Sequence, residues 1–285
     1  MHKIAILSDI HGNLTALEAV LADAQREQVT QYWIMGDLLM PGPGSSDLLQ
    51  RLRALPNVTF LKGNWDDWFL KFRDLDLDHP TNLFGARLAM YQLGGLSREE
   101  IDFLENVPLF TIKKIEGFDF LLCHNLPDNP YGGQLWISAE QGNFDSLFAQ
   151  HQVDVAVYGH VHHQTLRYSS KDQLIINPGA VCISYFDWQK HHQANLNHAQ
   201  YAIIEVTSER IGDIRFKKVA YDIEQEIKLA TERNLPYLDL YIDSLKTGRN
   251  YTHDHETLTR VNSERGYKAE VLAYFKDSKT EMESF

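Results

Sequence analysis

The N-terminal part of the chain alternates between short apolar runs and helix-like segments, and this alternation constrains the fold more than any other feature. Apolar runs occupy residues 3–8, 31–35 and 58–61, while residues 13–28 and 47–55 favour helices. Strands that alternate with helices form layered α/β folds, in which the strands pair in parallel. We therefore expect an α/β fold for this part of the chain.

Polar residues follow each of these apolar runs. Asp9 and His11 come after the first run, and Asp37 and Asn64, each directly after a glycine, follow the second and third. Ligands of open α/β sheets bind at the carboxyl ends of the strands. The sequence therefore brings four candidate ligands to one edge of one sheet.

The second half of the chain has a different pattern, which favours mostly antiparallel pairing. Hairpins are expected for residues 109–123 and 200–221, and a buried strand over residues 153–158 leads into Gly159-His160. Shorter strands at 166–168 and 174–176 enclose a polar turn. Helices are expected over residues 222–233, 238–245 and, within a polar tail, 268–276.

Domain organisation follows from the absence of an internal repeat, a low-complexity tract or a clear linker. We expect a single domain over residues 1–285, with a core of about 1–222 and a C-terminal helical extension of about 223–285. The extension either covers the site or packs on a neighbouring molecule, and the sequence leaves both alternatives open.

The polar groups that follow apolar strands form a candidate metal site with mixed nitrogen and oxygen ligands. Such a set suits Mn, Fe, Zn, Ni or Co better than Ca or Mg. Seven ligands exceed one tetrahedral site and suit two ions that share a carboxylate. Residues i and i+2 of a strand point the same way, so one ion can take both side chains of an Asp-x-His or His-x-His pair. The candidates are Asp9, His11, Asp37, Asn64, His124, His160 and His162.

The same blocks resemble those of the calcineurin-like metallophosphoesterase superfamily. SDIHGN (8–13), GD (36–37), GN (63–64), His124 and GHVH (159–162) are similar to the five blocks of that family, in order, and the resemblance spans roughly residues 3–182. It implies a four-layer α-β-β-α sandwich of two mixed β-sheets flanked by helices. The chain resembles the small bacterial-type phosphodiesterases and diadenosine polyphosphate hydrolases of the family.

The resemblance also implies a role for each candidate residue. Asp37 would bridge two divalent transition-metal ions, Mn and/or Fe first, with Zn, Ni or Co as alternatives. The first ion would be held by Asp9, His11 and His162, and the second by Asn64, His124 and His160. Asp37, Asn64 and His124 are the expected catalytic residues, and a metal-bridging hydroxide is the expected nucleophile on phosphorus.

The sequence departs from the family at the group that would protonate the leaving group. Many members carry a histidine directly after the GN asparagine, whereas this chain has Trp65. The general acid is therefore unassigned. His163 is a weak candidate, with a supporting or surface histidine as the alternative. Asn13 either caps the first helix or contacts phosphate.

Aromatic residues gather in segments that could roof the site, at 65–107, 125–142 and 183–199. Aromatic faces can stack nucleobases. Trp68, Phe69 and Phe72 are also explained as the buried face of a helix, while Trp136 and Tyr185 fit either interpretation. We expect a small nucleotide substrate, such as a diadenosine polyphosphate or ATP, cleaved at a phosphodiester or phosphoanhydride bond.

Composition narrows the partners. The net charge of −12 disfavours binding to long nucleic acid. No run approaches the roughly 18 apolar residues of a membrane helix, and we expect a cytoplasmic protein without a membrane partner. Cys123 and Cys182 are expected to be buried thiols. The other histidine-rich patches are expected to be solvated loops, at His191, His192, His198, His253 and His255. The oligomeric state is open.

Three alternative functions remain at this point. One is a catalytically inactive binding scaffold with the phosphoesterase fold, which would show an eroded ligand set. Another is a phosphoprotein phosphatase, against which Trp65 counts. The third is a nuclease acting on DNA ends, which the acidic charge disfavours.

Overall fold

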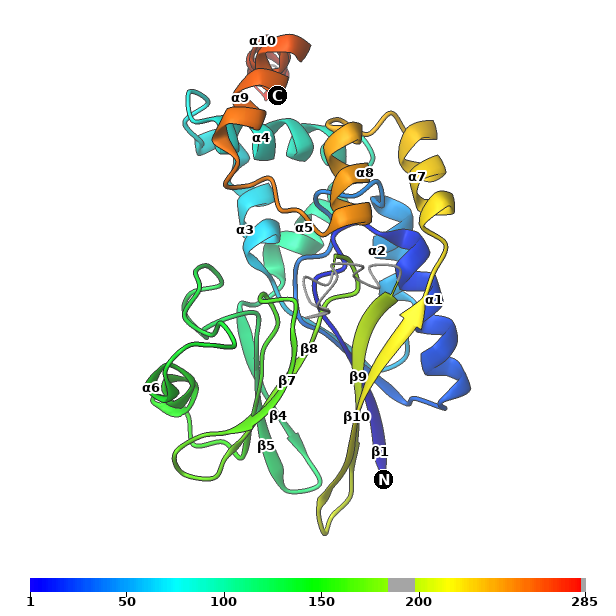
Figure 1. Cartoon of the computed structure of the whole chain (residues 1–285), viewed down its shortest axis with the longest axis vertical. Coiled ribbons are helices and arrows are strands. Elements are labelled where there is room, and N and C mark those ends of the chain that lie inside the picture. The colour runs from blue at the N-terminus through cyan, green and yellow to red at the C-terminus, as the bar shows by residue number, and fades with distance from the viewer. Residues whose placement is uncertain (184–197, 283–285) are drawn as a thin grey trace.

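Two five-stranded β-sheets form the centre of the protein, for which a computed structural model describes residues 1–183 and 198–282 (Figure 1). The first sheet has, in spatial order, β10 (Ile211–Ala220), β9 (His198–Val206), β1 (His2–Leu7), β2 (Gln31–Ile34) and β3 (Val58–Phe60). The second has β4 (Phe110–Ile115), β5 (Phe118–Cys123), β6 (Val155–Val157), β8 (Leu174–Pro178) and β7 (Gln164–Tyr168).

Both sheets are mixed, as the sequence predicted. In the first, β1, β2 and β3 are parallel, and β9 is antiparallel to β1 and β10. In the second, β5, β6 and β8 are parallel, and β4 and β7 are antiparallel edge strands. The expectation of a mostly antiparallel second half is therefore only partly right. The chain crosses over between β5 and β6 through α6 (Gln141–Asp145) and η2 (Ser146–Phe148), and such crossovers produce parallel pairs.

Alternation along β1 shows how the layers are held together. Ile4 and Ile6 belong to the apolar cluster between the two sheets, whereas Ala5 and Leu7 belong to the cluster under the helices. This is the expected consequence of side chains pointing to opposite faces of a strand. A third cluster lies on the outer face of the second sheet, where Phe144 of α6 packs. The four-layer α-β-β-α sandwich is thus confirmed.

Helices of the N-terminal half cover the outer face of the first sheet or continue from its edge. They are α1 (Leu14–Arg26), α2 (Ser46–Arg53), α3 (Asn64–Leu70), η1 (Phe72–Asp74), α4 (Pro80–Leu93) and α5 (Arg98–Asn106). The sequence predicted α1 and α2 within two residues of their observed ends but did not predict α4 or α5. Asn13 caps α1, because its Oδ1 accepts a hydrogen bond from the Ala16 backbone N–H at 2.8 Å.

The C-terminal extension contains four helices rather than the three expected. They are α7 (Ile223–Glu232), α8 (Leu238–Thr247), α9 (His255–Arg265) and α10 (Tyr267–Met282), and α9 was not predicted. α7 packs on α1, while α9 and α10 pack on α4 at the end of the molecule far from the N-terminus (Figure 1). The extension thus packs against the rest of the same chain.

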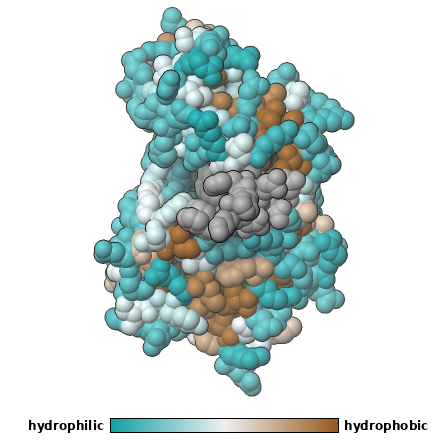
Figure 2. Space-filling model, in the orientation of Figure 1, coloured by the Kyte–Doolittle hydropathy of each residue, from teal (hydrophilic) through white to brown (hydrophobic). Residues whose placement is uncertain are grey.

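The surface, the two cysteines and the helices can be compared with the expectations drawn from composition. The visible face is mostly hydrophilic, with an apolar patch in the lower half of the view (Figure 2). Cys123 and Cys182 are free and buried, as predicted. No helix in the described ranges is both long and apolar enough to span a membrane.

Candidate metal centre

The candidate ligands lie on loops that leave the strands, and five of them have left-handed backbone conformations. The φ angles are 54° at Asp9, 51° at His11, 56° at Asp37, 65° at His160 and 51° at His162. Such conformations are uncommon for residues other than glycine and cluster at functional sites. The explanation of the i, i+2 pairs by strand alternation was therefore wrong, because tight turns beyond the strand ends aim these side chains.

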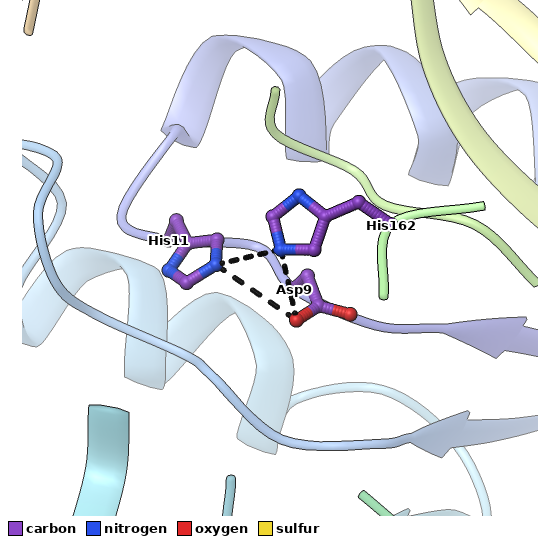
Figure 3. Close-up of side chains that lie close together, drawn as sticks. All are labelled: Asp9, His11 and His162. Carbon is purple, nitrogen blue, oxygen red and sulfur yellow. Dashed lines mark hydrogen bonds and ion pairs between the residues drawn. The ribbon is translucent and has the colours of Figure 1, made fainter. Parts of the chain in front are cut away.

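Asp9, His11 and His162 form the first group of candidate ligands (Figure 3). Nε2 of His162 lies 3.2 Å from Oδ1 of Asp9, and Nε2 of His11 lies 3.8 Å from the same oxygen. The two imidazole Nε2 atoms are 3.2 Å apart. All three side chains point to one spot, although they come from the loop after β1 and from the loop between β6 and β7.

The second group lies beside the first and is connected to it by Asp37. Nε2 of His124 is 3.4 Å from Oδ2 of Asp37 and 3.0 Å from Oδ1 of Asn64. Nδ1 of His160 is 2.8 Å from the same oxygen of Asn64. Oδ2 of Asp37 also lies 3.7 Å from Nε2 of His11. The structure therefore brings all seven sequence-predicted residues into one cluster, with Asp37 between its two halves.

Backbone carbonyls fix the orientation of the imidazoles. A carbonyl can only accept a hydrogen bond, so the ring nitrogen beside it carries the proton and the opposite nitrogen keeps its lone pair. Nδ1 of His11, His124 and His162 donates to the carbonyls of Met40, Met35 and Ile183 at 2.5, 2.7 and 2.6 Å, respectively. In these three residues Nε2 is therefore available to a cation.

His160 uses the opposite tautomer. Its Nε2 donates to the carbonyl of Gly132 at 2.9 Å, which leaves Nδ1 facing Asn64. Asn125 holds that carbonyl in place, since its side-chain amide donates to the carbonyls of Tyr131 and Gly132 at 2.7 and 3.2 Å. The loop before α6 thus orients a candidate ligand.

A buried oxygen without a hydrogen-bond partner shows that the cluster fits a metal. Within the described chain, Oδ1 of Asp9 is buried and has no such partner. Its nearest polar neighbours are imidazole nitrogens, including that of His162. Buried carboxylates are normally paired or bind metals. A divalent ion between Asp9 and the Nε2 lone pairs would satisfy all of them.

The pKa values of this cluster point the same way. Burial lowers the pKa of His124, but the carboxylates of Asp37 and Asp9 outweigh it and raise the pKa to about 10. Burial lowers the pKa of His162 as well, and Asp9 more than reverses the effect. The carboxylates of Asp9 and Asp37 thus stabilise positive charge beside them, and without a metal this charge is carried by the protonated imidazoles. A bound metal would displace these protons, since a ligating imidazole must be neutral.

Asp66 supports Asp37 from behind, a role the sequence analysis did not assign. Its carboxylate accepts backbone N–H groups of Asp37, Leu38 and Gly63 at 2.7, 2.9 and 2.9 Å. Burial, together with the charge of Asp37, raises the pKa of Asp66 to about 6. The backbone N–H of Trp65 donates to Oδ1 of Asp37 at 2.8 Å. Asp66 therefore connects the turn that carries Asp37 to the turn that precedes α3.

Glycines at the two turns leave room for this arrangement. A Cβ added at Gly63 would lie 2.1 Å from Oδ1 of Asp37, and one at Gly36 would lie 2.5 Å from the backbone nitrogen of Gly63. Both distances are shorter than any real Cβ contact. The GD and GN pairs of the sequence are therefore explained by the close approach of these two turns.

A cavity of ≈620 Å³ opens beside the cluster. Its lining includes five of the candidate ligands: His11, Asp37, Asn64, His160 and His162. Three aromatic residues considered from the sequence, Trp65, Trp68 and Trp136, also line it. Phe69 and Phe72 are instead buried, as the helix-face interpretation predicted.

The far side of the cavity comes from the C-terminal extension, which the sequence analysis did not place there. Tyr237, Tyr241, Ser244 and residues 249–253 line this side. The only sequence signal was their aromatic and polar content, which is equally typical of core and loops. The extension therefore borders the site, as the first of the two alternatives for it predicted.

The remaining histidines and aromatics are placed as follows. His163 is half-buried and is absent from the cavity lining. His253 is exposed as predicted but lines the cavity, while His198 begins β9 rather than lying in a loop. Three residues of the sequence analysis lie outside the described residues: Tyr185, His191 and His192.

Comparison with known proteins identifies the domain type. The family described as the calcineurin-like phosphoesterase superfamily domain matches residues 2–209 of the chain. An uncharacterized protein of Methanocaldococcus jannaschii is 27% identical over 243 residues, which cover 82% of this chain and 93% of that protein.

A shorter match concerns nucleotide hydrolases. The symmetrical bis(5'-nucleosyl)-tetraphosphatase of Serratia proteamaculans is 40% identical over 63 residues, which cover 21% of this chain and 22% of that enzyme. The likeness is therefore confined to one segment of each protein.

Two solved structures resemble the whole fold. The metallophosphoesterase from Sphaerobacter thermophilus has a TM-score of 0.63 and 26% identity, covering 87% of this chain and 100% of its own. A hypothetical protein from Pyrococcus horikoshii OT3 has a TM-score of 0.72 at 18% identity, covering 88% and 100%. The second likeness concerns the fold alone.

Proposed function

Since the chain belongs to the calcineurin-like phosphoesterase superfamily and is a metal-dependent phosphoesterase, we propose that it uses two divalent transition-metal ions to cleave phosphodiester or phosphoanhydride bonds in small nucleotides. The observation that carries the proposal is the cluster of seven candidate ligands, with Asp37 between its two halves, beside a cavity of ≈620 Å³. Mn and Fe suit this mixed nitrogen and oxygen set, as do Zn, Ni and Co.

Each residue has a proposed role in this site. Asp37 would bridge the two ions, and its position is fixed by Asp66 and by the Trp65 backbone N–H. The first ion would be held by Asp9, His11 and His162, and the second by Asn64, His124 and His160. Asp37, Asn64 and His124 are the proposed catalytic residues: Asp37 and Asn64 line the cavity, and His124 contacts Oδ1 of Asn64 at 3.0 Å.

The chain's own contribution is to hold neutral imidazoles and two carboxylates around a low-dielectric pocket. When bound, the ions supply a hydroxide nucleophile at neutral pH and neutralise charge on the phosphate oxygens. Two divalent ions against Asp9 and Asp37 leave a net positive site, which attracts phosphate despite the overall charge of −12. Hydrogen bonds to backbone carbonyls hold the imidazoles of His11, His124 and His162 in the orientation that a metal requires.

The residue after Asn64 indicates which kind of leaving group the site can release. Trp65 stands where many relatives have a histidine, and its ring packs edge-on to His11 with the centroids 5.6 Å apart. An indole supplies no acidic proton at neutral pH. Leaving groups that depart without protonation, such as a nucleotide phosphate, therefore suit this site better than simple alcohols.

A nucleotide is supported by two further observations. The cavity is lined by several aromatic rings, which can stack a base. The partial match is to enzymes named as bis(5'-nucleosyl)-tetraphosphatases. A diadenosine polyphosphate or ATP is thus the substrate to test first.

The test is a hydrolysis panel with purified protein and added Mn²⁺. It compares an aryl phosphomonoester, an aryl phosphodiester, ATP and diadenosine tetraphosphate, for the native chain and for Asp37→Asn. Asp172→Asn is the matched control, because Asp172 is an exposed turn residue with a φ of 61°, which asparagine tolerates.

We expect hydrolysis by the native protein and by the control, loss in Asp37→Asn, and the highest kcat/KM for a nucleotide. Nucleotides turned over no better than the aryl phosphodiester would remove the nucleotide assignment alone. If the protein stays inactive with Mn²⁺, the catalytic proposal fails and the binding-scaffold function is favoured instead.

A further inference from the structure

The far wall of the cavity belongs to a part of the chain outside the family domain. The match to the superfamily ends at residue 209. The cavity is also lined by Tyr237, which precedes α8, by Tyr241 of α8, and by residues 249–253 of the loop after it. The metal-ligand edge lies within the matched residues, whereas these wall residues lie beyond them.

The wall is held in place by specific contacts. The Thr81 hydroxyl of α4 donates to the Thr252 carbonyl at 2.7 Å. Tyr237 packs on Phe84 of α4 with ring centroids 4.6 Å apart, and its hydroxyl donates to Asn262 at 2.6 Å. The wall is thus a positioned surface rather than a loosely attached tail.

Rings line much of the space beyond the metal ligands. Trp65, Trp68 and Phe84 come from α3 and α4, and Tyr237 and Tyr251 from the extension. Trp68 lies directly on the backbone of α4, because a Cβ at Gly85 would be 2.4 Å from its indole ring. This part of the cavity therefore presents fixed aromatic surface to a ligand.

Charge is scarce on the same surface. Among described residues that line the cavity, Arg249 is the only lysine or arginine and Asp37 the only acid. Arg249 is itself paired with Asp254 at 2.5 Å. A further chain of phosphates would find almost no positive partner here. The part of a ligand that lies against this wall is therefore neutral.

Tyr251 is the residue of the extension best placed to meet such a ligand. Its hydroxyl donates to Asp243 at 2.5 Å, and the Arg249 guanidinium lies 4.8 Å from its ring centroid. These two contacts fix the ring from its end and from one face. The ring is 8% exposed and belongs to the apolar cluster under the helices, and it borders the cavity at the edge of that cluster.

We infer that the extension forms a binding subsite for the neutral aromatic group of a phosphorylated ligand, a nucleobase, with Tyr251 as its specificity-determining residue. The phosphate would lie at the metal centre, so this assignment rests on the proposed function for its anchor. The base would stack against the aromatic wall, which is worth about tenfold or more in affinity.

The test compares ligands that differ only in the base. Binding of 5′-AMP, ribose 5-phosphate and phenyl phosphate to Mn²⁺-loaded protein is measured by calorimetry. We expect 5′-AMP to bind about tenfold or more tighter than ribose 5-phosphate. Equal affinities would overturn the subsite. If phenyl phosphate binds as tightly as 5′-AMP, the subsite accepts aryl phosphates in general. If phenyl phosphate binds more weakly than 5′-AMP, the subsite is selective for a nucleotide.

Variants then locate the effect. Tyr251→Leu should remove most of the preference for 5′-AMP and leave ribose 5-phosphate within about twofold, because only stacking is lost. Tyr251→Phe keeps the ring and should keep the preference. Tyr168→Leu is the matched control, since Tyr168 is exposed on β7 and is absent from the cavity lining.

A second variant tests the inference if Tyr251→Leu does not fold. Arg249→Ala changes a side chain that is 56% exposed and should weaken 5′-AMP alone, by about threefold, through loss of the cation–π contact. A uniform loss for both ligands in Tyr251→Leu and Arg249→Ala would contradict the subsite. Base-selective binding without hydrolysis would refute the proposed function and retain the subsite, whereas hydrolysis without base selectivity would do the reverse.

Discussion

The metal-ligand edge and the far wall border the same cavity, but the chain encodes them in different ways. The edge is built from single residues at strand ends, each of a type that binds metals, such as Asp9 and His124. The wall is built from tyrosines and an arginine in α8 and the segments that flank it. These residue types do not by themselves indicate a particular ligand. The edge determines the chemistry, and the wall is placed to determine what is brought to it.

The difference also appears in how the two regions are fixed. The edge depends on backbone strain and on carbonyls that orient each imidazole, as at His11 and His162. The wall depends on ring packing and on hydroxyl bonds, such as that of Thr81. Changes at the edge should therefore affect kcat and metal affinity, and changes at the wall should affect KM.

The largest effect is expected from metal removal. Dialysis against a chelator should lower kcat by about a thousandfold or more, since the metals contribute several kcal/mol of transition-state stabilisation. Mn²⁺ should restore it. Steady-state kinetics with a circular-dichroism control for folding measures this. Full activity in chelated, metal-free protein would show that the edge does not act through metals.

The next effect is expected at Asp66. Asp66→Asn keeps the size but loses part of a carboxylate that accepts three backbone N–H groups. We expect metal affinity and kcat to fall about 10- to 100-fold, as for other residues that orient ligands. Asp67→Asn is the matched control, because that carboxylate bonds Tyr131 and Lys71 instead. Similar losses in both variants would contradict a specific role of Asp66.

A smaller effect is expected at the wall. Thr81→Val removes the hydroxyl that holds the Thr252 carbonyl, a bond worth about 1 kcal/mol. We expect KM for a nucleotide to rise about threefold or more with kcat unchanged. Thr259→Val, which loses a bond within α9, is the control. A fall in kcat without a change in KM would mean that wall and edge are not separable.

The smallest effect on catalysis is expected at Asn13. Its side chain is buried, caps α1 and faces Cys182 and Tyr221 rather than the cavity. Asn13→Ala should cost about 1 kcal/mol of unfolding free energy and leave KM within twofold. Denaturant unfolding and kinetics measure the two quantities. A large rise in KM would restore the phosphate-contact alternative.

Sequence reasoning reached the edge because each ligand there has a local signature. Asp37 and Asn64 follow glycines after apolar runs, and these glycines are required by the close approach of two turns. The structure confirms the layered fold and brings the predicted residues together. It replaces the reason given for the Asp9–His11 spacing, because the chain has already left the strand at those residues.

The wall could not be reached in the same way. Tyr237 and Tyr251 have no spacing that separates a cavity wall from a packed core, and their positions depend on how α8 packs on α7 and α9 on α4. Asp66 was overlooked for a related reason. Its role depends on backbone groups of Asp37 and Leu38, which are distant in sequence and become neighbours only in the fold.

The central claim is that Asp37 bridges two metal ions, and metal content tests it most directly. Plasma mass spectrometry of the native protein, Asp37→Asn and Asp172→Asn, each purified after Mn²⁺ loading, gives the metal stoichiometry per chain. The account predicts about two ions in the native protein and the control, as expected for a two-metal site, and about one or fewer in Asp37→Asn. Two ions retained in Asp37→Asn, or none in the native protein, would contradict it.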